Sequence, residues 1–479
     1  MNWFLHIFEL FVRMGWLIMT PILITLCGKA LGLSLGNAVS AGVRTTGAVF
    51  GLNLMANSLG SNLTSVIADI TLNYQLALEI TDAGWAASSA IAYASTISSW
   101  IIPLHLLVNW VMLLSRCTRT LNLDLWNLWH VAFLGAMVER LTDSLAYGMV
   151  TAGAMSVLIL IFSDRCGWRM ARYCQIPGIS VTSGYATAAV PFGLVAEHLF
   201  NLIPGRPRLV LAKGTEPRAA LASPVAWSFS LGILLGVLAG REGIAILQLA
   251  MTFGALAFLA PHLGQAFAGA ITPVGERMVS FSREKLGIKG NLYLGMTPTT
   301  TLGNGTMVVV TLMVAPLITF LAGNIPGNRF LVQGDIVMLP YIIGVIVIVC
   351  RGDLMRSLLA GLLASSTILW CASSLAELFT LGAVTANAEA FEQLGTISNF
   401  SDGGNFLCWL SVQAGSYGFA GMALMVVVVV TLAVWNRNRI VTGADVAGLR
   451  PKRVRRAEDA PAPEPAPAAE PQEDAGAQQ

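Results

Sequence analysis

Residues 82–96 read DAGWAASSAIAYAST, and residues 295–306 read GMTPTTTLGNGT. Apart from Asp82, each stretch lies in a long charge-free run, yet it carries small and hydroxylated residues where an ordinary membrane-spanning helix carries Leu and Val. Glycine, proline and runs of Ser or Thr interrupt a helix. Interrupted backbone is tolerated in a bilayer only where it is buried in protein or lines a cavity. We therefore expect two re-entrant hairpins, each with its tip near the middle of a membrane. The alternative is a pair of kinked spans whose small residues allow close helix packing.

The composition of the whole chain supports a membrane environment. Of its 479 residues, 55% are hydrophobic and 11% are charged, whereas a soluble globular chain carries roughly 25% charged residues. So few charges cannot cover a soluble fold of this size, which excludes a secreted disulfide scaffold, a cytosolic enzyme and a nucleic-acid-binding protein. The net charge of +2 gives no reason to expect a nucleic-acid partner either.

Long charge-free runs mark the segments that we expect in the bilayer. They are 45–68, 83–115, 144–163, 173–196, 219–240, 243–275, 290–328, 336–350, 357–376 and 403–436. A spanning helix needs about 20 apolar residues, so the longest runs hold one span and some further structure. With a first span near 15–33, these runs predict an all-α polytopic membrane protein with about ten or eleven transmembrane segments.

Lys and Arg gather in the short loops 116–119, 206–218 and 277–289, and most densely after Trp435. By the positive-inside rule these segments face the cytoplasm, so the C-terminus is predicted to be cytoplasmic. Residues 441–479 are rich in Pro, Ala, Glu and Gln. Such a segment cannot bury enough apolar surface to fold, and we expect a disordered cytoplasmic tail.

The two halves of the chain share a pattern of similar residues. At a constant offset of 211 residues, like residues match in four places: Gly84 with Gly295, Ser88-Ser89 with Thr299-Thr300, Asp124 with Asp335, and Arg140 with Arg351. This offset predicts a first repeat over residues 1–215 and a second over 216–440. An odd number of spans in each half makes the two repeats inverted, as in transporters built from two related halves.

Neutral polar residues of the two interrupted segments are the candidate substrate-binding groups. They are Ser88, Ser89, Thr299, Thr300, Thr301 and Asn304. Hydroxyl and amide groups are the donors and acceptors that an uncharged polyol needs. Trp85 either stacks on the C–H face of a sugar or belongs to the aromatic belt at the membrane surface.

Ionisable residues near the membrane form a second group of candidates. His130 begins an apolar segment, where it either bonds substrate and takes up a hydroxyl proton or packs between helices; His105 and His262 are expected to pack. Asp124 and Asp335 precede apolar segments, so they either cap helices or bond substrate, and Asp402 precedes a turn. The chain has no spacing typical of metal ligands, a phosphate-binding loop or a catalytic triad, so we expect no metal and no cofactor.

Several motifs resemble the galactitol-type IIC permeases of the bacterial phosphotransferase system. The most specific is DLWNLWH at residues 124–130. The others are GW at 84–85 with SS at 88–89, LLSRCTR at 113–119, IPGN at 325–328, GD at 334–335, RG at 351–352 and DGGN at 402–405. The resemblance covers roughly residues 10–440, in order and with similar spacing.

This resemblance implies a homodimeric permease of the bacterial inner membrane that carries its substrate in a mobile core, in the manner of an elevator. The substrate is then phosphorylated by a separate IIB protein, itself charged by IIA, HPr and enzyme I, because this chain shows no phosphorylated residue of its own. The pattern of galactitol permeases differs at Thr297, Asn304 and residues 182–184. We therefore expect a galactitol-like polyol or a related sugar. The alternative is an ion-coupled secondary transporter that moves an unmodified polar solute.

Overall fold

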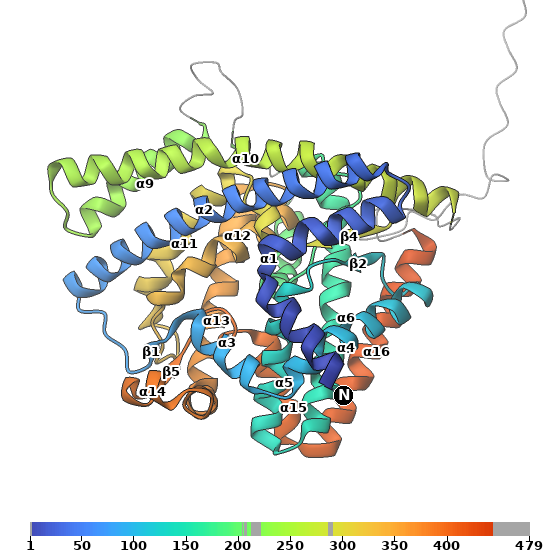
Figure 1. The fold of residues 1–479 in the computed structure, drawn as a ribbon. Coiled ribbons are helices and arrows are strands. Elements are labelled where there is room, and N and C mark those ends of the chain that lie inside the picture. Colours follow the sequence, from blue (N-terminus) through green and yellow to red (C-terminus); the bar gives the residue numbers. More distant parts are fainter. Residues whose placement is uncertain (1, 204, 206–207, 212–221, 286–290, 444–479) are drawn as a thin grey trace, which may run out of the picture.

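The computed structural model describes residues 2–443 except residues 204, 206–207, 212–221 and 286–290. The fold is mostly helical (Figure 1). Its helices are α1 Asn2–Ala30, α2 Leu35–Asn73, α3 Gly84–Ala94, α4 Ile97–Leu114, α5 Trp129–Thr142, α6 Leu145–Arg169, α7 Val190–Asn201, α9 Pro224–Leu238, α10 Gly243–Glu284, α11 Gly305–Ala322, α12 Leu339–Val349, α13 Leu354–Ala386, α14 Ala388–Phe391, α15 Phe406–Ser416 and α16 Gly418–Thr442. The strands are β1 Thr81–Asp82, β2 Thr120–Asn122, β3 Ile179–Val181, β4 Tyr293–Met296 and β5 Ile397–Ser398.

Within the described residues, six helices are long and apolar enough to cross a membrane, namely α4, α6 with its extension to Cys174, α10, α11, α13 and α16. Three shorter apolar helices accompany them, at Met14–Ala30, Pro224–Leu238 and Gly334–Val349. The chain is therefore a mostly helical membrane protein, while the total of ten or eleven segments stays a prediction. The most apolar part of α11 is 72% buried and that of α16 is 11% buried, so α11 lies in the core and α16 offers its sides to lipid.

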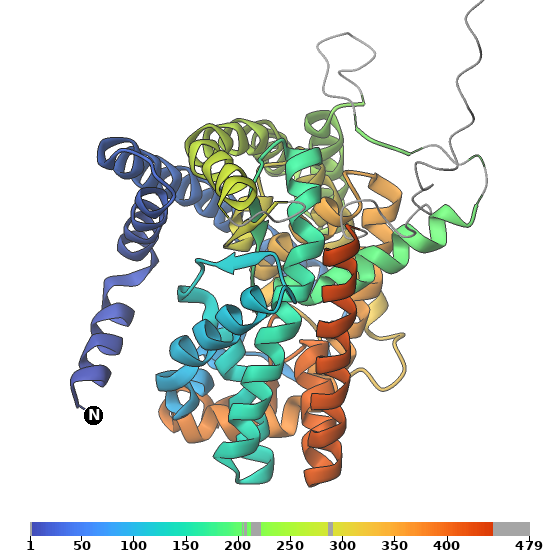
Figure 2. The same ribbon diagram turned by 90° about the vertical axis from the view of Figure 1, so that its right-hand side faces the viewer.

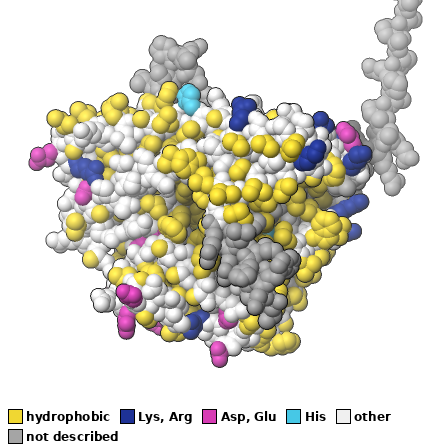
Figure 3. All heavy atoms as spheres, viewed as in Figure 1, with side chains coloured by type: hydrophobic (Ala, Val, Ile, Leu, Met, Phe, Trp, Pro, Cys, Tyr) yellow, Lys and Arg dark blue, Asp and Glu magenta, His cyan; other side chains and the backbone are white. Residues whose placement is uncertain are grey.

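The long helices α2, α9 and α10 run across one side of the molecule, at a steep angle to α6 and α16 (Figure 1). Seen from the side, α6 and α16 run next to each other (Figure 2). Small residues allow the first group to pack closely. A methyl group added at Gly232 of α9 would lie 2.6 Å from the Ala250 Cα of α10, and one added at Gly42 of α2 would lie 2.6 Å from the Pro21 carbonyl oxygen of α1. Hydrophobic side chains cover much of the surface seen in Figure 3, as expected of a surface that faces lipid.

The short strands join the two halves of the chain. β1 pairs in parallel with β5, with Thr81 opposite Ile397. β4 lies between β2 and β3 and is parallel to both, with Leu294 opposite Leu121 and Ile179. Each half thus supplies a strand that leads into its interrupted segment, and the other half supplies a partner for that strand.

Both interrupted segments are broken in the structure. Between α3 and α4 the helix is interrupted at Ser95 and Thr96. In the second half β4 leads into a single 3₁₀ turn, η4 (Pro298–Thr301), and α11 starts only at Gly305. The predicted tail lies outside the described residues beyond Gly443, and α16 itself continues to Thr442.

The close packing of the second break against α10 gives a test of this arrangement. A methyl group at Gly264 of α10 would lie 2.5 Å from the Gly303 carbonyl oxygen, whereas one at Gly269 of the same helix would meet nothing within 4 Å. Because the contact is with rigid backbone, Gly264→Ala is expected to destabilise the protein by about 1 to 3 kcal/mol. The apparent melting temperature in detergent measures this loss. Gly269→Ala is the matched control, and an equal shift in both variants would refute the contact.

Candidate functional site

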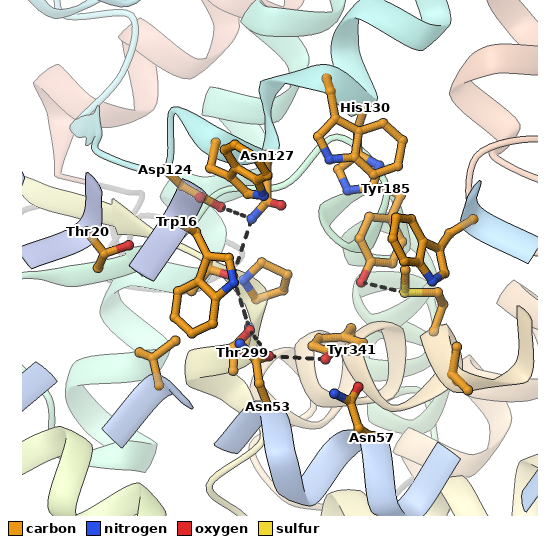
Figure 4. A pocket seen from close by; sticks show the side chains of 18 residues that line it. Trp16, Thr20, Asn53, Asn57, Asp124, Asn127, His130, Tyr185, Thr299 and Tyr341 are labelled. Atoms are coloured by element: carbon orange, nitrogen blue, oxygen red, sulfur yellow. Dashed lines mark hydrogen bonds between the residues drawn. The ribbon is translucent and has the colours of Figure 1, made fainter. Parts of the chain in front are cut away.

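A cavity of about 260 Å³ opens where α1 and α2 face the loops that precede α5 and follow β4. We call it the aromatic cavity (Figure 4). Its lining residues are Trp16, Thr20, Val49, Asn53, Asn57, Trp85, Asp124, Trp126, Asn127, Trp129, His130, Tyr185, Thr297, Pro298, Thr299, Val337, Met338 and Tyr341. A cavity of this size holds a small solute, and its walls combine aromatic rings with neutral amides and hydroxyls.

A belt of hydrogen bonds connects the polar groups of the wall, as the dashed lines in Figure 4 show. Asn127 Nδ2 donates to Asp124 Oδ2 over 2.7 Å and reaches Thr297 Oγ1 at 3.4 Å. Thr299 Oγ1 then donates to Asn53 Oδ1 over 3.0 Å, and the Tyr341 hydroxyl donates to the same oxygen over 3.1 Å. The belt therefore joins α2 to loops of both halves and fixes these side chains at the edge of the cavity.

Asp124 is the one carboxylate among the described residues that line the aromatic cavity. It lies in the loop between α4 and α5, where burial raises the pKa of its carboxyl to about 6 and the hydrogen bond from Asn127 opposes that shift. A carboxylate that accepts from one amide keeps further lone pairs for the hydroxyl groups of a solute.

His130 lies at the start of α5 and lines the cavity, and its ring is hydrogen-bonded on the side away from the cavity. Its Nδ1 lies 2.9 Å from Asp402 Oδ1 and 3.0 Å from Oδ2, and both side chains are almost completely buried. A carboxylate at Nδ1 favours the proton on that nitrogen, which leaves Nε2 as an acceptor. Within the described residues Nε2 has no hydrogen-bond partner, so it is available to a solute.

Behind this wall, Asp402 belongs to a second network. The Ser88 hydroxyl reaches Asp402 Oδ2 at 3.2 Å, and Asn399 Nδ2 donates to Ser88 Oγ over 2.8 Å. Asp335 Oδ2 accepts from the Ser401 amide over 2.7 Å. Ser88, Asp335 and Asp402 therefore orient the loop that carries the partner of His130 rather than lining the aromatic cavity.

The structure separates the predicted site residues into three groups. Trp85, Asp124, His130 and Thr299 line the aromatic cavity. The second group, Ser88, Asp335 and Asp402, lies behind its wall.

Thr300, Thr301 and Asn304 form the third group and line a different, larger cavity of about 800 Å³, which we call the large cavity. It also contacts Tyr173 and His262. The Asn304 amide donates to the Tyr173 hydroxyl over 2.6 Å. The stretch from Thr297 to Thr306 thus lies between two cavities.

Two sequence-based interpretations need correction. The Ser89 hydroxyl bonds back to the Ala86 carbonyl of its own helix and lines neither cavity. Neither Asp124 nor Asp335 is a helix N-cap, because Leu125 and Gln333 occupy that position in η1 (Trp126–Leu128) and η5 (Gly334–Met338). His105 is buried as expected, bonded to Ser156 and Asn122.

Sequence analysis missed several residues of the cavity. Asn53 and Asn57 lie one helical turn apart on α2, inside a charge-free run, and a pair of amides at that spacing was a usable signal. Trp126 and Trp129 belong to the 124–130 motif already singled out. Trp16 and Tyr341 carried no signal in the sequence. Within the described residues no group of three or more His, Cys, Asp or Glu could hold a metal ion.

Comparisons with known proteins agree on one family. The sequence model of the family described as "PTS system sugar-specific permease component" (EIIC-GAT) matches residues 11–395, which include every described lining residue of the aromatic cavity. The galactitol-specific EIIC component of the phosphotransferase system of Escherichia coli (strain K12) is 29% identical over 415 residues, or 86% of this chain and 91% of that protein. A putative permease IIC component of the same strain is 28% identical over 435 residues, or 90% of this chain and 99% of that protein.

The two neighbouring serines of α3 test the network behind the wall. Ser88→Ala removes a hydroxyl that bonds both Asp402 and Asn399, so we expect a loss of about 1 to 3 kcal/mol in stability. Ser89→Ala is the matched control, expected to stay within about 0.5 kcal/mol of the parent protein. Thermal unfolding in the same detergent measures both, and a larger effect at Ser89 would contradict the assignment.

Proposed function

Because the chain belongs to the family of sugar-specific permease components of the phosphotransferase system, we propose that the aromatic cavity binds a hexitol-like polyol or a related sugar for transport. The observation that carries this proposal is the cavity wall itself. Four Trp rings, neutral amides and hydroxyls surround one histidine and one carboxylate. Aromatic faces stack on the C–H groups of a sugar while amides and hydroxyls satisfy its hydroxyl groups, so an uncharged polyhydroxylated solute suits the wall better than an ion.

His130 has the central chemical role in this proposal. Its Nε2 accepts a hydrogen bond from a substrate hydroxyl, and Asp402 stabilises the imidazolium that forms when that hydroxyl gives up its proton. That oxygen then attacks the phosphorus atom carried by the donor protein, and the bond between phosphorus and the donor breaks as the new P–O bond forms. The same arrangement positions the substrate before transfer, since the ring is fixed by Asp402 on one side and by Tyr185, 4.6 Å away between ring centroids, on another.

The phosphoryl donor in this proposal is a separate IIB protein, supplied through IIA, HPr and enzyme I. The relative from E. coli is named as the EIIC component of a galactitol-specific system, which supports a division of labour between components. In that division this chain binds and moves the sugar and contributes no phosphorylated residue.

We further propose that each chain folds as two inverted repeats. Two such chains form a homodimer that works as an elevator-type transporter in the bacterial inner membrane. The exchange of strands between the halves and the matching order of a 3₁₀ turn followed by a helix, at η1–α5 and η5–α12, support the repeat. The aromatic cavity lies where α1 and α2 meet the rest of the chain. In an elevator mechanism, movement of one of these two parts relative to the other would carry a solute bound between them. The homodimer rests on the family resemblance.

The orientation of the chain in the membrane follows from where its basic segments lie close together. Arg437 Nε donates to the Ser115 carbonyl over 3.1 Å, and Asn436 Nδ2 donates to Asp164 Oδ2 of α6 over 2.7 Å. The basic residues around 116–119 and 437–439 therefore gather near the C-terminal end of α6. By the positive-inside rule this end, and the C-terminus with it, faces the cytoplasm in our proposal.

Replacing His130 with Gln is expected to lower the rate of substrate phosphorylation by about 100-fold, the usual size of general-base assistance. His105→Gln is the control, because His105 is equally buried but bonds only Ser156 and Asn122. Rates are normalised to the amount of each protein in the membrane. Equal losses in the two variants would assign His130 to helix packing.

Membrane vesicles distinguish the proposal from an ion-coupled transporter. Labelled hexitols are offered with and without phosphoenolpyruvate and the soluble phosphotransferase proteins. We expect hexitol phosphate to form and accumulate only when both are present. Accumulation of the unmodified hexitol in response to an ion gradient alone would contradict the proposal and favour secondary transport.

A further inference from the structure

Three arginines converge on one carboxylate at the C-terminal end of α6. Arg169 Nη2 lies 3.2 Å from Glu197 Oε2, and Glu197 Oε1 lies 3.1 Å from Arg208 Nη2 and 2.9 Å from Arg351 Nη2. We call these four residues the arginine cluster. One carboxylate neutralises one guanidinium, so the cluster keeps an excess of two positive charges.

The exposure of the cluster shows where this excess charge is available. The side chains of Arg169 and Glu197 are each 7% exposed and form its buried base. Those of Arg208 and Arg351 are 30% and 35% exposed, so both side chains are partly open to solvent while each is bonded to Glu197. Planar donors held in place with free outer edges match the oxygens of a phosphate group.

The backbone at Arg351 is held in an unusual conformation. Its φ is +56°, in the left-handed region that residues with a side chain rarely adopt. Gly352 follows at φ +75°, and the Tyr173 hydroxyl occupies the space that a side chain at Gly352 would need. Tyr173 lines the large cavity and accepts the hydrogen bond from Asn304. The cluster therefore adjoins the large cavity through a single tyrosine.

The opposite end of α6 has the opposite charge. Asp143 lies just before α6, and together with Glu139 and Arg140 it lines a pocket of about 310 Å³ with an excess of one negative charge. A helix of 25 residues separates the two ends by about 37 Å. Arg140 at this end and Arg351 in the arginine cluster are equivalent positions of the predicted repeat. Because only the group around Arg351 has an excess of positive charge, that excess belongs to one end of the molecule and is not common to both repeats.

We infer that Arg208 and Arg351 bind the phosphoryl group of a phosphate monoester beside the large cavity. This inference rests on the proposed function and adds a second site to it, distinct from the aromatic cavity where the uncharged sugar binds. A phosphoryl group reaches this end either on the phosphorylated sugar as it leaves or on the donor protein as it docks. The chemistry recognised is the same in both cases.

The test uses the full chain purified in detergent, with inorganic phosphate as the first probe. Phosphate is expected to raise the apparent melting temperature of the parent protein in a saturable manner, and chloride at equal ionic strength is expected to have no such effect. Arg351→Gln and Arg208→Gln should each weaken phosphate binding by about tenfold or more, the loss of one charge-assisted hydrogen bond. Arg329→Gln is the control, because Arg329 is an exposed arginine whose ion pair is with Glu79 alone.

Arg208→Gln is expected to fold normally, because Arg208 is partly exposed and bonds Glu197 through one nitrogen only. It therefore keeps the test valid if Arg351→Gln misfolds. If phosphate fails to stabilise the parent protein, or stabilises it and both cluster variants alike, the inference is wrong. Hexitol binding to the same preparations, followed by tryptophan fluorescence, is expected to be unchanged in Arg351→Gln. Hexitol binding without phosphate binding would overturn the second site and leave the proposed function intact; absence of hexitol binding would instead count against the proposed function.

Two further measurements identify the source of the phosphoryl group. A weaker affinity of the cluster variants for hexitol phosphate, with an unchanged KM for phosphorylated IIB, assigns the site to the departing product. A raised KM for phosphorylated IIB, with unchanged affinity for hexitol phosphate, assigns it to the donor. If neither quantity changes in either variant, the arginine cluster only joins helices and the inference is refuted.

Discussion

The structure depends on how the backbone at the two interrupted segments obtains hydrogen bonds. Unpaired amide groups are costly where water is absent, so each break needs side chains that accept from it. The Asp82 carboxylate accepts from the amides of Gly84, Gln333 and Asp335 at 2.8 to 3.0 Å. Asp335 in turn accepts from Ser401. Carboxylates of the two halves thus satisfy the loops on which the cavity walls are built.

This constraint also explains how polar groups are distributed around the aromatic cavity. The carboxylates that satisfy backbone amides lie behind the wall, and mainly neutral side chains face the cavity. His130 connects the two layers, because Asp402 fixes one ring nitrogen and the cavity receives the other. The orientation of the imidazole therefore depends on the loop around Asp402, and that loop depends on Asn399, whose side chain accepts from the Gly403 amide over 2.6 Å.

The sequence predicted the breaks well, because glycine, proline and hydroxylated residues interrupt helices wherever they occur. Four of the residues predicted to bind substrate line the aromatic cavity, namely Trp85, Asp124, His130 and Thr299. The sequence did not indicate that the adjacent threonines would line different cavities, which follows because a 3₁₀ turn has three residues per turn and directs neighbouring side chains about 120° apart. Thr299 therefore faces one cavity and Thr300 the other. The contact of Ser88 with Asp402 spans 314 residues, and no local pattern indicates a pairing at that distance.

The exchange of strands between the halves has a consequence for how the chain assembles during synthesis. Thr81 finds its partner only when Ile397 has left the ribosome, and β3 remains without one until β4 has been made. Contacts so far apart in the chain close slowly, because the entropy of a long loop must be lost first. The strands of the first half can therefore pair only after their partners in the second half have been synthesised.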